Sequence, residues 1–112
     1  MQQGSTPTIP LTIKGVDVTE ARIFLTILDD LTKKKITLVS GEDFTASYDQ
    51  VNHNTVFEIE LTQEQTLGLS AGTCTMQARW AFPDGKTGGT GKAKVNVSDV
   101  IYGEEIAYDR DG

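Results

Sequence analysis

The clearest structural signal in the chain lies in residues 57–65, which read Phe57-Glu58-Ile59-Glu60-Leu61-Thr62-Gln63-Glu64-Gln65. Apolar and acidic residues alternate with a period of two in the first half, as is typical of a strand with one face on a core and the other in water. The second half fits a capping box, in which the Thr62 hydroxyl accepts from the Gln65 N–H while the Gln65 side chain reaches back. The stretch therefore predicts a strand that leads directly into a helix.

This predicted helix, over residues 63–68, is a short crossover between two strands. Gly68 and Gly72 interrupt the sequence that follows, and glycine disfavours helix, so only one or two turns fit. We expect Leu67, alone or with Leu69, to close one end of the hydrophobic core.

The rest of the chain is rich in β-branched residues. Its 112 residues include 15 Thr, 8 Val and 8 Ile, and such side chains fit a pleated sheet better than a helix. Pro10 has no N–H to donate to a neighbouring strand, which predicts that the first strand lies at a sheet edge. Alternation bounded by turn residues predicts further strands at residues 8–13, 21–28, 36–39, 44–48, 73–81 and 93–97.

Strands at this spacing favour an all-β fold, an immunoglobulin-like antiparallel β-sandwich of about seven strands with one short crossover helix near residues 63–68. The Cys…Trp…Cys pattern of antibody domains is absent, so the assignment depends on strand spacing and topology. We expect one domain over residues 1–98. Residues 99–112 form a partly apolar C-terminal tail, for which ordering only on assembly is one option.

Composition argues against several kinds of partner. The formal charge is −6, with 16 Asp and Glu against 10 Lys and Arg, whereas a nucleic-acid-binding protein needs a positive face. No apolar run approaches the ~20 residues of a membrane-spanning helix. The N-terminus lacks the basic start and apolar stretch of a signal peptide. We therefore expect no nucleic acid, no membrane and no secretion by a signal peptide.

The sequence contains no recognisable catalytic or cofactor-binding motif. The only histidine, His53, lies in an Asn-rich loop without a neighbouring nucleophile. Cys74 shares a predicted strand face with Met76 and Trp80, which indicates packing. The Gly-rich stretch 85–92 lacks the first glycine of a phosphate loop, and we interpret it as a flexible hairpin tip between the last two strands. The prediction is a protein that is not an enzyme and has no cofactor or metal site.

The second face of the predicted strand 21–28 is unusually apolar. Phe24 and Leu28 point away from the core-facing residues of this strand, where an independent sandwich usually carries polar side chains. One interpretation is that loops or the tail cover them, and the other is a contact between subunits. As a candidate interface we take the apolar residues of this face and of the tail, namely Phe24, Leu28, Ile101, Tyr102, Ile106 and Tyr108.

Several short motifs follow one another in a distinctive order along the chain. They are Gln3-Gly4-Ser5-Thr6-Pro7-Thr8, Asp17-Val18-Thr19-Glu20-Ala21, Leu61-Thr62-Gln63-Glu64-Gln65-Thr66-Leu67, Gly72-Thr73, Trp80, Asp84-Gly85, Val95-Asn96-Val97 and Ile101. In this order the chain resembles small proteins encoded in tail or baseplate regions of bacteriophages and prophages of Gram-positive bacteria. These have an immunoglobulin-like sandwich related to the N-terminal domain of baseplate upper proteins.

The resemblance implies a structural, non-catalytic role in a phage or prophage particle. The implied partners are other phage structural proteins or copies of the chain itself, so an oligomer is one expectation. The implied location is the virion, or the cytoplasm of a bacterial host before assembly. The resemblance carries no catalytic or ligand-binding residues over to this sequence.

The alternative function is a carbohydrate-binding β-sandwich at a bacterial or viral surface. Such sites present several exposed aromatic residues beside polar groups. Here Trp80 is expected to face inward, and Tyr48, Tyr102 and Tyr108 are scattered in the sequence. An exposed Trp80 on a shallow groove would favour sugar binding.

Overall fold

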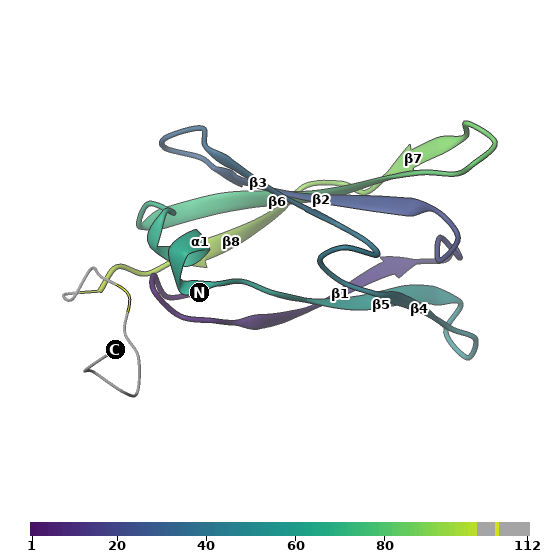
Figure 1. The fold of residues 1–112 in the computed structure, drawn as a ribbon, viewed down its shortest axis with the longest axis horizontal. Coiled ribbons are helices and arrows are strands. Elements are labelled where there is room, and N and C mark those ends of the chain that lie inside the picture. The colour runs from purple at the N-terminus through teal and green to yellow at the C-terminus, as the bar shows by residue number, and fades with distance from the viewer. Residues whose placement is uncertain (101–104, 106–112) are drawn as a thin grey trace.

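The computed structural model describes residues 1–100 and Glu105. Two antiparallel sheets lie one above the other, with a short helix at one end of the sandwich (Figure 1). The tail residues of the predicted interface, Ile101, Tyr102, Ile106 and Tyr108, lie outside the described residues. The elements in chain order are β1 (Thr8–Lys14), β2 (Arg22–Asp29), β3 (Lys35–Val39), β4 (Ala46–Asp49), β5 (Asn54–Glu60), α1 (Gln63–Leu67), β6 (Gly72–Ala81), β7 (Thr87–Gly89) and β8 (Ala93–Val97).

The strand order confirms the predicted immunoglobulin-like sandwich. The smaller sheet has the order β1-β5-β4, and the larger sheet has the order β3-β2-β6, with β7 and β8 both on the far side of β6. In an immunoglobulin sandwich, strands B, E and D share one sheet, and C′, C, F and G share the other. β1, β5 and β4 take the first set of places here, and β3, β2, β6 and the β7–β8 pair take the second. Pro10 lies in an edge strand, as predicted.

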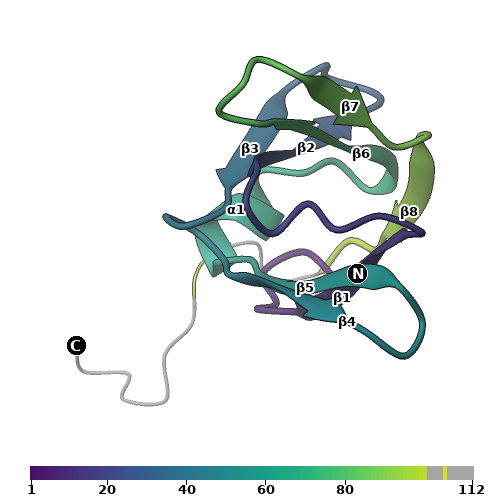
Figure 2. The ribbon, with the colours of Figure 1, turned by 90° about the vertical axis from the view of Figure 1, so that its right-hand side faces the viewer.

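The eighth strand arises because the last strand of the sandwich is divided. β8 pairs with the first half of β6, from Gly72 to Met76, and β7 pairs with its end, from Arg79 to Ala81. Figure 2 shows β8 along one side of the sandwich, below β7. The interpretation of residues 85–92 as a flexible hairpin tip was therefore wrong for Thr87–Gly89. Glycine backbones pair with β6 there without any side-chain alternation to reveal them.

Alternating side chains from both sheets fill the space between them. On β5, Phe57 and Ile59 are buried while Glu58 and Glu60 are exposed, as the alternation predicted. The rings of Phe44 and Phe57 stack with centroids 4.6 Å apart. The buried apolar residues form one cluster: Ile13, Val18, Ala21, Ile23, Leu25, Ile27, Leu38, Phe44, Phe57, Ile59, Leu61, Leu69, Cys74, Met76, Ala78 and Val97.

The predicted capping box begins α1. The Gln65 N–H donates to Thr62 Oγ1 at 3.1 Å, and the Thr62 N–H donates to Gln65 Oε1 at 2.9 Å. Leu69, just after the helix, is the leucine that joins the core, whereas Leu67 is only half-buried and lies beside Gly4. Within residues 1–100, no helix is long and apolar enough to cross a membrane.

Candidate functional site

The candidate site is the outer face of the larger sheet, which we call the Phe24 face. Strand register places its residues, because side chains of paired residues lie on the same side of a sheet. The outward residues of β2 alternate with the core residues of the same strand. The Phe24 face consists of Arg22, Phe24, Thr26 and Leu28 on β2, their outward partners Lys35, Thr37, Val39, Thr75, Gln77, Arg79 and Ala81, and Lys94 on β8.

Phe24 is the most unusual residue of this face. It lies between Val39 and Arg79 on the two neighbouring strands, and 37% of its surface is exposed. The other large apolar side chains that are exposed among the described residues, Leu31 and Val51, lie in turns. A shallow depression of about 390 Å³ beside Phe24 is also lined by Arg79. The described loops therefore leave part of the phenyl ring open to solvent.

Leu28 also lies on the outward side of β2, as predicted, but it is half-buried. It lines a second groove of about 410 Å³ on the same face, together with Lys35, Lys92 and Lys94. The structure thus brings Phe24 and Leu28 onto one surface, as the alternation predicted. Whether the tail residues share this surface stays a prediction, since they lie outside the described residues.

Cations are concentrated on the Phe24 face. Arg22 forms an ion pair with Glu42 at 2.9 Å, and Lys94 forms one at 3.0 Å with Asp30, which directly follows β2. Lys35 and Arg79 are exposed and have no ion pair with any described residue. Lys92, in the groove beside them, is likewise exposed and unpaired within that part of the chain. The face therefore keeps a positive excess in a chain of formal charge −6.

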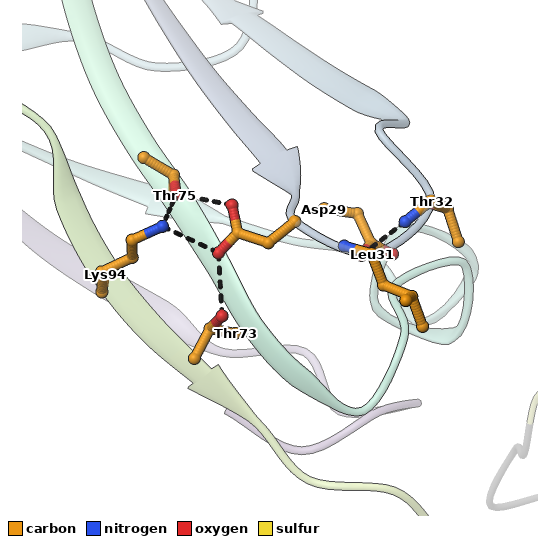
Figure 3. Close-up of polar contacts among 7 residues, drawn as sticks. Asp29, Leu31, Thr32, Thr73, Thr75 and Lys94 are labelled. Carbon is orange, nitrogen blue, oxygen red and sulfur yellow. Dashed lines mark hydrogen bonds and ion pairs between the residues drawn. The ribbon is translucent and has the colours of Figure 1, made fainter.

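The carboxylate at this end of the face belongs to Asp30. Its two oxygens accept from Thr75 Oγ1 at 2.7 Å and from Thr73 Oγ1 at 2.8 Å, and Lys94 Nζ lies 3.0 Å from one of them. Figure 3 labels these three partners, Thr73, Thr75 and Lys94, at the ends of the dashed lines. Hydrogen bonds from Thr75, Lys94 and Thr73 lower the pKa of Asp30 to about 2. The network joins the segment directly after β2 to β6 and β8, and it holds the Lys94 side chain in place at this end of the Phe24 face.

The neighbouring Asp29 points the other way and is buried. Its carboxylate accepts from the backbone N–H of Ser70 at 2.7 Å. It also accepts from the backbone N–H groups of Leu31 at 3.0 Å and Thr32 at 3.4 Å (Figure 3). These bonds, from Ser70 above all, hold the pKa of Asp29 well below its ordinary value. Asp29 and Asp30 directly follow the predicted strand 21–28, and neither was among the candidate residues. The phase of the alternation would have found Asp29, since it continues the inward series of β2.

The residues weighed for chemistry do not converge. His53 is exposed in the turn between β4 and β5, and its Nδ1 lies 3.2 Å from the hydroxyl of Tyr48. Cys74 is buried on β6, where desolvation raises the pKa of its thiol. No group of three or more His, Cys, Asp and Glu side chains within the described part of the chain is arranged to hold a metal ion.

Trp80 packs against the core, as predicted for this strand face. It is half-buried, and its indole lies against Gly88 on the neighbouring strand β7. Trp80 is thus not fully exposed, but it is one of the residues that line the shallow depression beside Phe24. The sugar-binding alternative stays a prediction.

Comparison with known proteins adds no relative to this description. No protein-family model matches the chain, and no curated protein matches it.

Proposed function

We propose that the chain is a non-catalytic structural module of a phage or prophage particle, associated with its tail or baseplate. In this role it binds neighbouring proteins through the Phe24 face. The phage setting is supported by the order of short motifs in the sequence. The binding surface is supported by the open phenyl ring of Phe24 on the outer face of the larger sheet.

The position of Phe24 on β2 suits it to a contact surface. β2 lies between β3 and β6, so its backbone is held by paired strands on both sides. A rigid platform loses little conformational freedom when a partner binds. The surface combines an aromatic residue with half-buried Leu28 and Val39, and cations surround these apolar residues. Interfaces commonly have an apolar centre with an aromatic anchor and a polar rim.

The phage setting is tested in the genome that encodes the chain and in its particles. Adjacent reading frames for tail, portal or capsid proteins, together with the chain's presence in purified particles, are the expected result. A chain that is absent from purified particles would contradict the proposal.

The binding surface is tested with Phe24→Asp in cells that assemble such particles. We expect the variant to fold and to lose at least tenfold in incorporation, because a charged side chain replaces the exposed ring. The matched control is Val51→Asp, which replaces an exposed valine in the turn between β4 and β5. Equal incorporation of both variants and wild type would assign binding to some other surface.

A further inference from the structure

The outer face of the smaller sheet is acidic where the Phe24 face is basic. We call it the Glu58 face, and it consists of Thr8, Pro10, Thr12, Lys14, Ser47, Asp49, Asn54, Val56, Glu58 and Glu60. Glu58 and Glu60 are successive outward residues of β5, and both are exposed. Neither has an ion pair with any residue that the structure describes. Lys14, the one cation of this face, lies at the opposite end of the paired strands, beside Asn54.

The middle of the Glu58 face is hollow and contains apolar residues among threonine and serine side chains. Val56 is half-buried there and is paired with Thr12 on the edge strand, while Pro10, two residues earlier on that strand, is paired with Glu58. Val56 and Pro10 line a shallow depression of about 510 Å³, together with threonine and serine side chains and Glu58. The Glu58 face thus offers a shallow hollow of mixed apolar and hydroxyl side chains with carboxylates beside it. The Phe24 face offers an aromatic side chain with unpaired cations beside it.

We propose that the partner of the Phe24 face is the Glu58 face of a second copy of the chain. This inference depends on the proposed function of the Phe24 face as a binding surface, and it names the occupant. Lys35, Arg79 and Lys92 of one copy then meet Glu58 and Glu60 of the next. Opposite charges brought together at an interface favour both encounter and register.

The two sheets lie on opposite sides of the molecule, so their outer faces point away from each other (Figure 1). A contact between them is head-to-tail, and each added copy presents a new free face of each kind. A two-fold contact between two Phe24 faces would instead bring Lys35 and Arg79 of one copy toward the same cations of the other. Charge therefore favours the head-to-tail arrangement.

The test uses charge reversal on each face of the full-length chain. One variant carries Lys35→Glu with Arg79→Glu, and the other carries Glu58→Lys with Glu60→Lys; all four residues are exposed. The molar mass of each protein, and of their equimolar mixture, is measured by light scattering over a range of concentrations. Measurements at about 10 mM and about 1 M salt compare Debye lengths of about 30 Å and about 3 Å.

We expect wild type at low salt to reach at least twice the monomer mass of 12.2 kDa and to return toward it at high salt. Each variant alone should stay monomeric, since its two faces carry the same sign. The mixture should regain association, because the acidic Phe24 face of one variant matches the basic Glu58 face of the other. A contact of this protein with itself through any other surface predicts no such recovery.

A control for net charge is Lys34→Glu with Lys86→Glu, which makes the same charge change as Lys35→Glu with Arg79→Glu but in connecting segments outside both faces. This control should associate like wild type. Wild type that stays monomeric at every concentration, or a mixture that stays monomeric, would overturn the inference. Either result leaves the proposed function standing if Phe24→Asp still loses incorporation into particles. The Phe24 face then binds a different protein.

Discussion

The indole of Trp80 occupies the space above the backbone of Gly88 on the neighbouring strand. A Cβ built on Gly88 would lie 2.5 Å from Nε1 and 2.6 Å from Cε2 of Trp80, closer than real Cβ atoms approach other heavy atoms. The rigid indole of Trp80 also packs against the hydrophobic core, which limits how far it can move away from Gly88. Residue 88 therefore has to be glycine for β7 to pair with β6 as it does.

Gly88→Ala should destabilise the fold. Either the indole or β7 has to move, and overpacking of this kind costs about 1–3 kcal/mol. Chemical denaturation followed by Trp80 fluorescence measures the change in the free energy of unfolding. The matched control is Gly91→Ala, where an added Cβ meets nothing within 4 Å. Equal stability of the two variants would contradict the close approach of Trp80 and Gly88.

Asp29→Ala should be among the most destabilising polar substitutions. It removes the acceptor for the N–H groups of Ser70, Leu31 and Thr32. These bonds are partly buried, and a donor left unsatisfied away from water costs about 1–3 kcal/mol, so a loss of roughly 1–3 kcal/mol is expected. Asp99→Ala, at an exposed position, serves as control. A loss below that of an ordinary surface substitution would show that the carboxylate does not tie these segments together.

Stability should fall in acid below the ordinary Asp pKa. The pKa of Asp30 is lowered from 3.8 to about 2 in the folded state, so the unfolded chain binds the proton more readily. The stabilisation is complete above pH 3.8 and is lost as the pH falls toward 2. We expect Asp30→Asn to reduce the slope of unfolding free energy against pH in this window. An unchanged slope would indicate that the hydrogen bonds of Thr73, Thr75 and Lys94 contribute little.

Thr62→Ala should weaken the crossover helix. The substitution removes the acceptor for the Gln65 N–H, and loss of a threonine N-cap typically costs about 1 kcal/mol. Thr62→Ser keeps the hydroxyl and should stay close to wild type in thermal unfolding. If serine and alanine lower the melting temperature equally, the effect comes from the lost methyl group and not from the cap.

The Cys74 thiol should react slowly with a thiol reagent in the folded protein. Only 1% of its surface is exposed, and burial raises the pKa of the thiol, so the reactive thiolate is scarce and shielded. The rate of modification should rise with denaturant in parallel with unfolding. Glutathione in the same buffer provides the unprotected reference. A folded protein that reacts as fast as glutathione would place Cys74 at the surface.

Side-chain alternation was enough to predict the strands that have one face on the core. Phe57, Ile59 and Leu61 point inward as expected, and the Thr62–Gln65 box begins the helix. β7 has two glycines in three residues, so its pairing with β6 produces no alternation of side chains in the sequence. This is why the strand at Thr87–Gly89 was missed. Leu67, alone or with Leu69, was expected to close one end of the core, and of the two only Leu69 is fully buried there. The turn after the helix decides which leucine reaches the core, and helix periodicity does not show this turn.

The candidate site was predicted only in part. Alternation on β2 put Phe24 and Leu28 on the outward side, since that placement follows from the phase of one strand. The gathering of Lys35, Arg79 and Lys92 around them depends on which strands are neighbours. These residues come from three separate segments, and nothing local in the sequence shows that they share a surface.

The proline in β1 bears on aggregation between copies of this molecule. An exposed edge strand can pair with a strand of another molecule, and natural proteins prevent this with proline or with short edge strands. Pro10 removes one backbone N–H donor from the edge strand β1, and the other edge strand of the smaller sheet, β4, has only four residues. Edge-to-edge strand pairing between copies is therefore disfavoured at both edges of the smaller sheet.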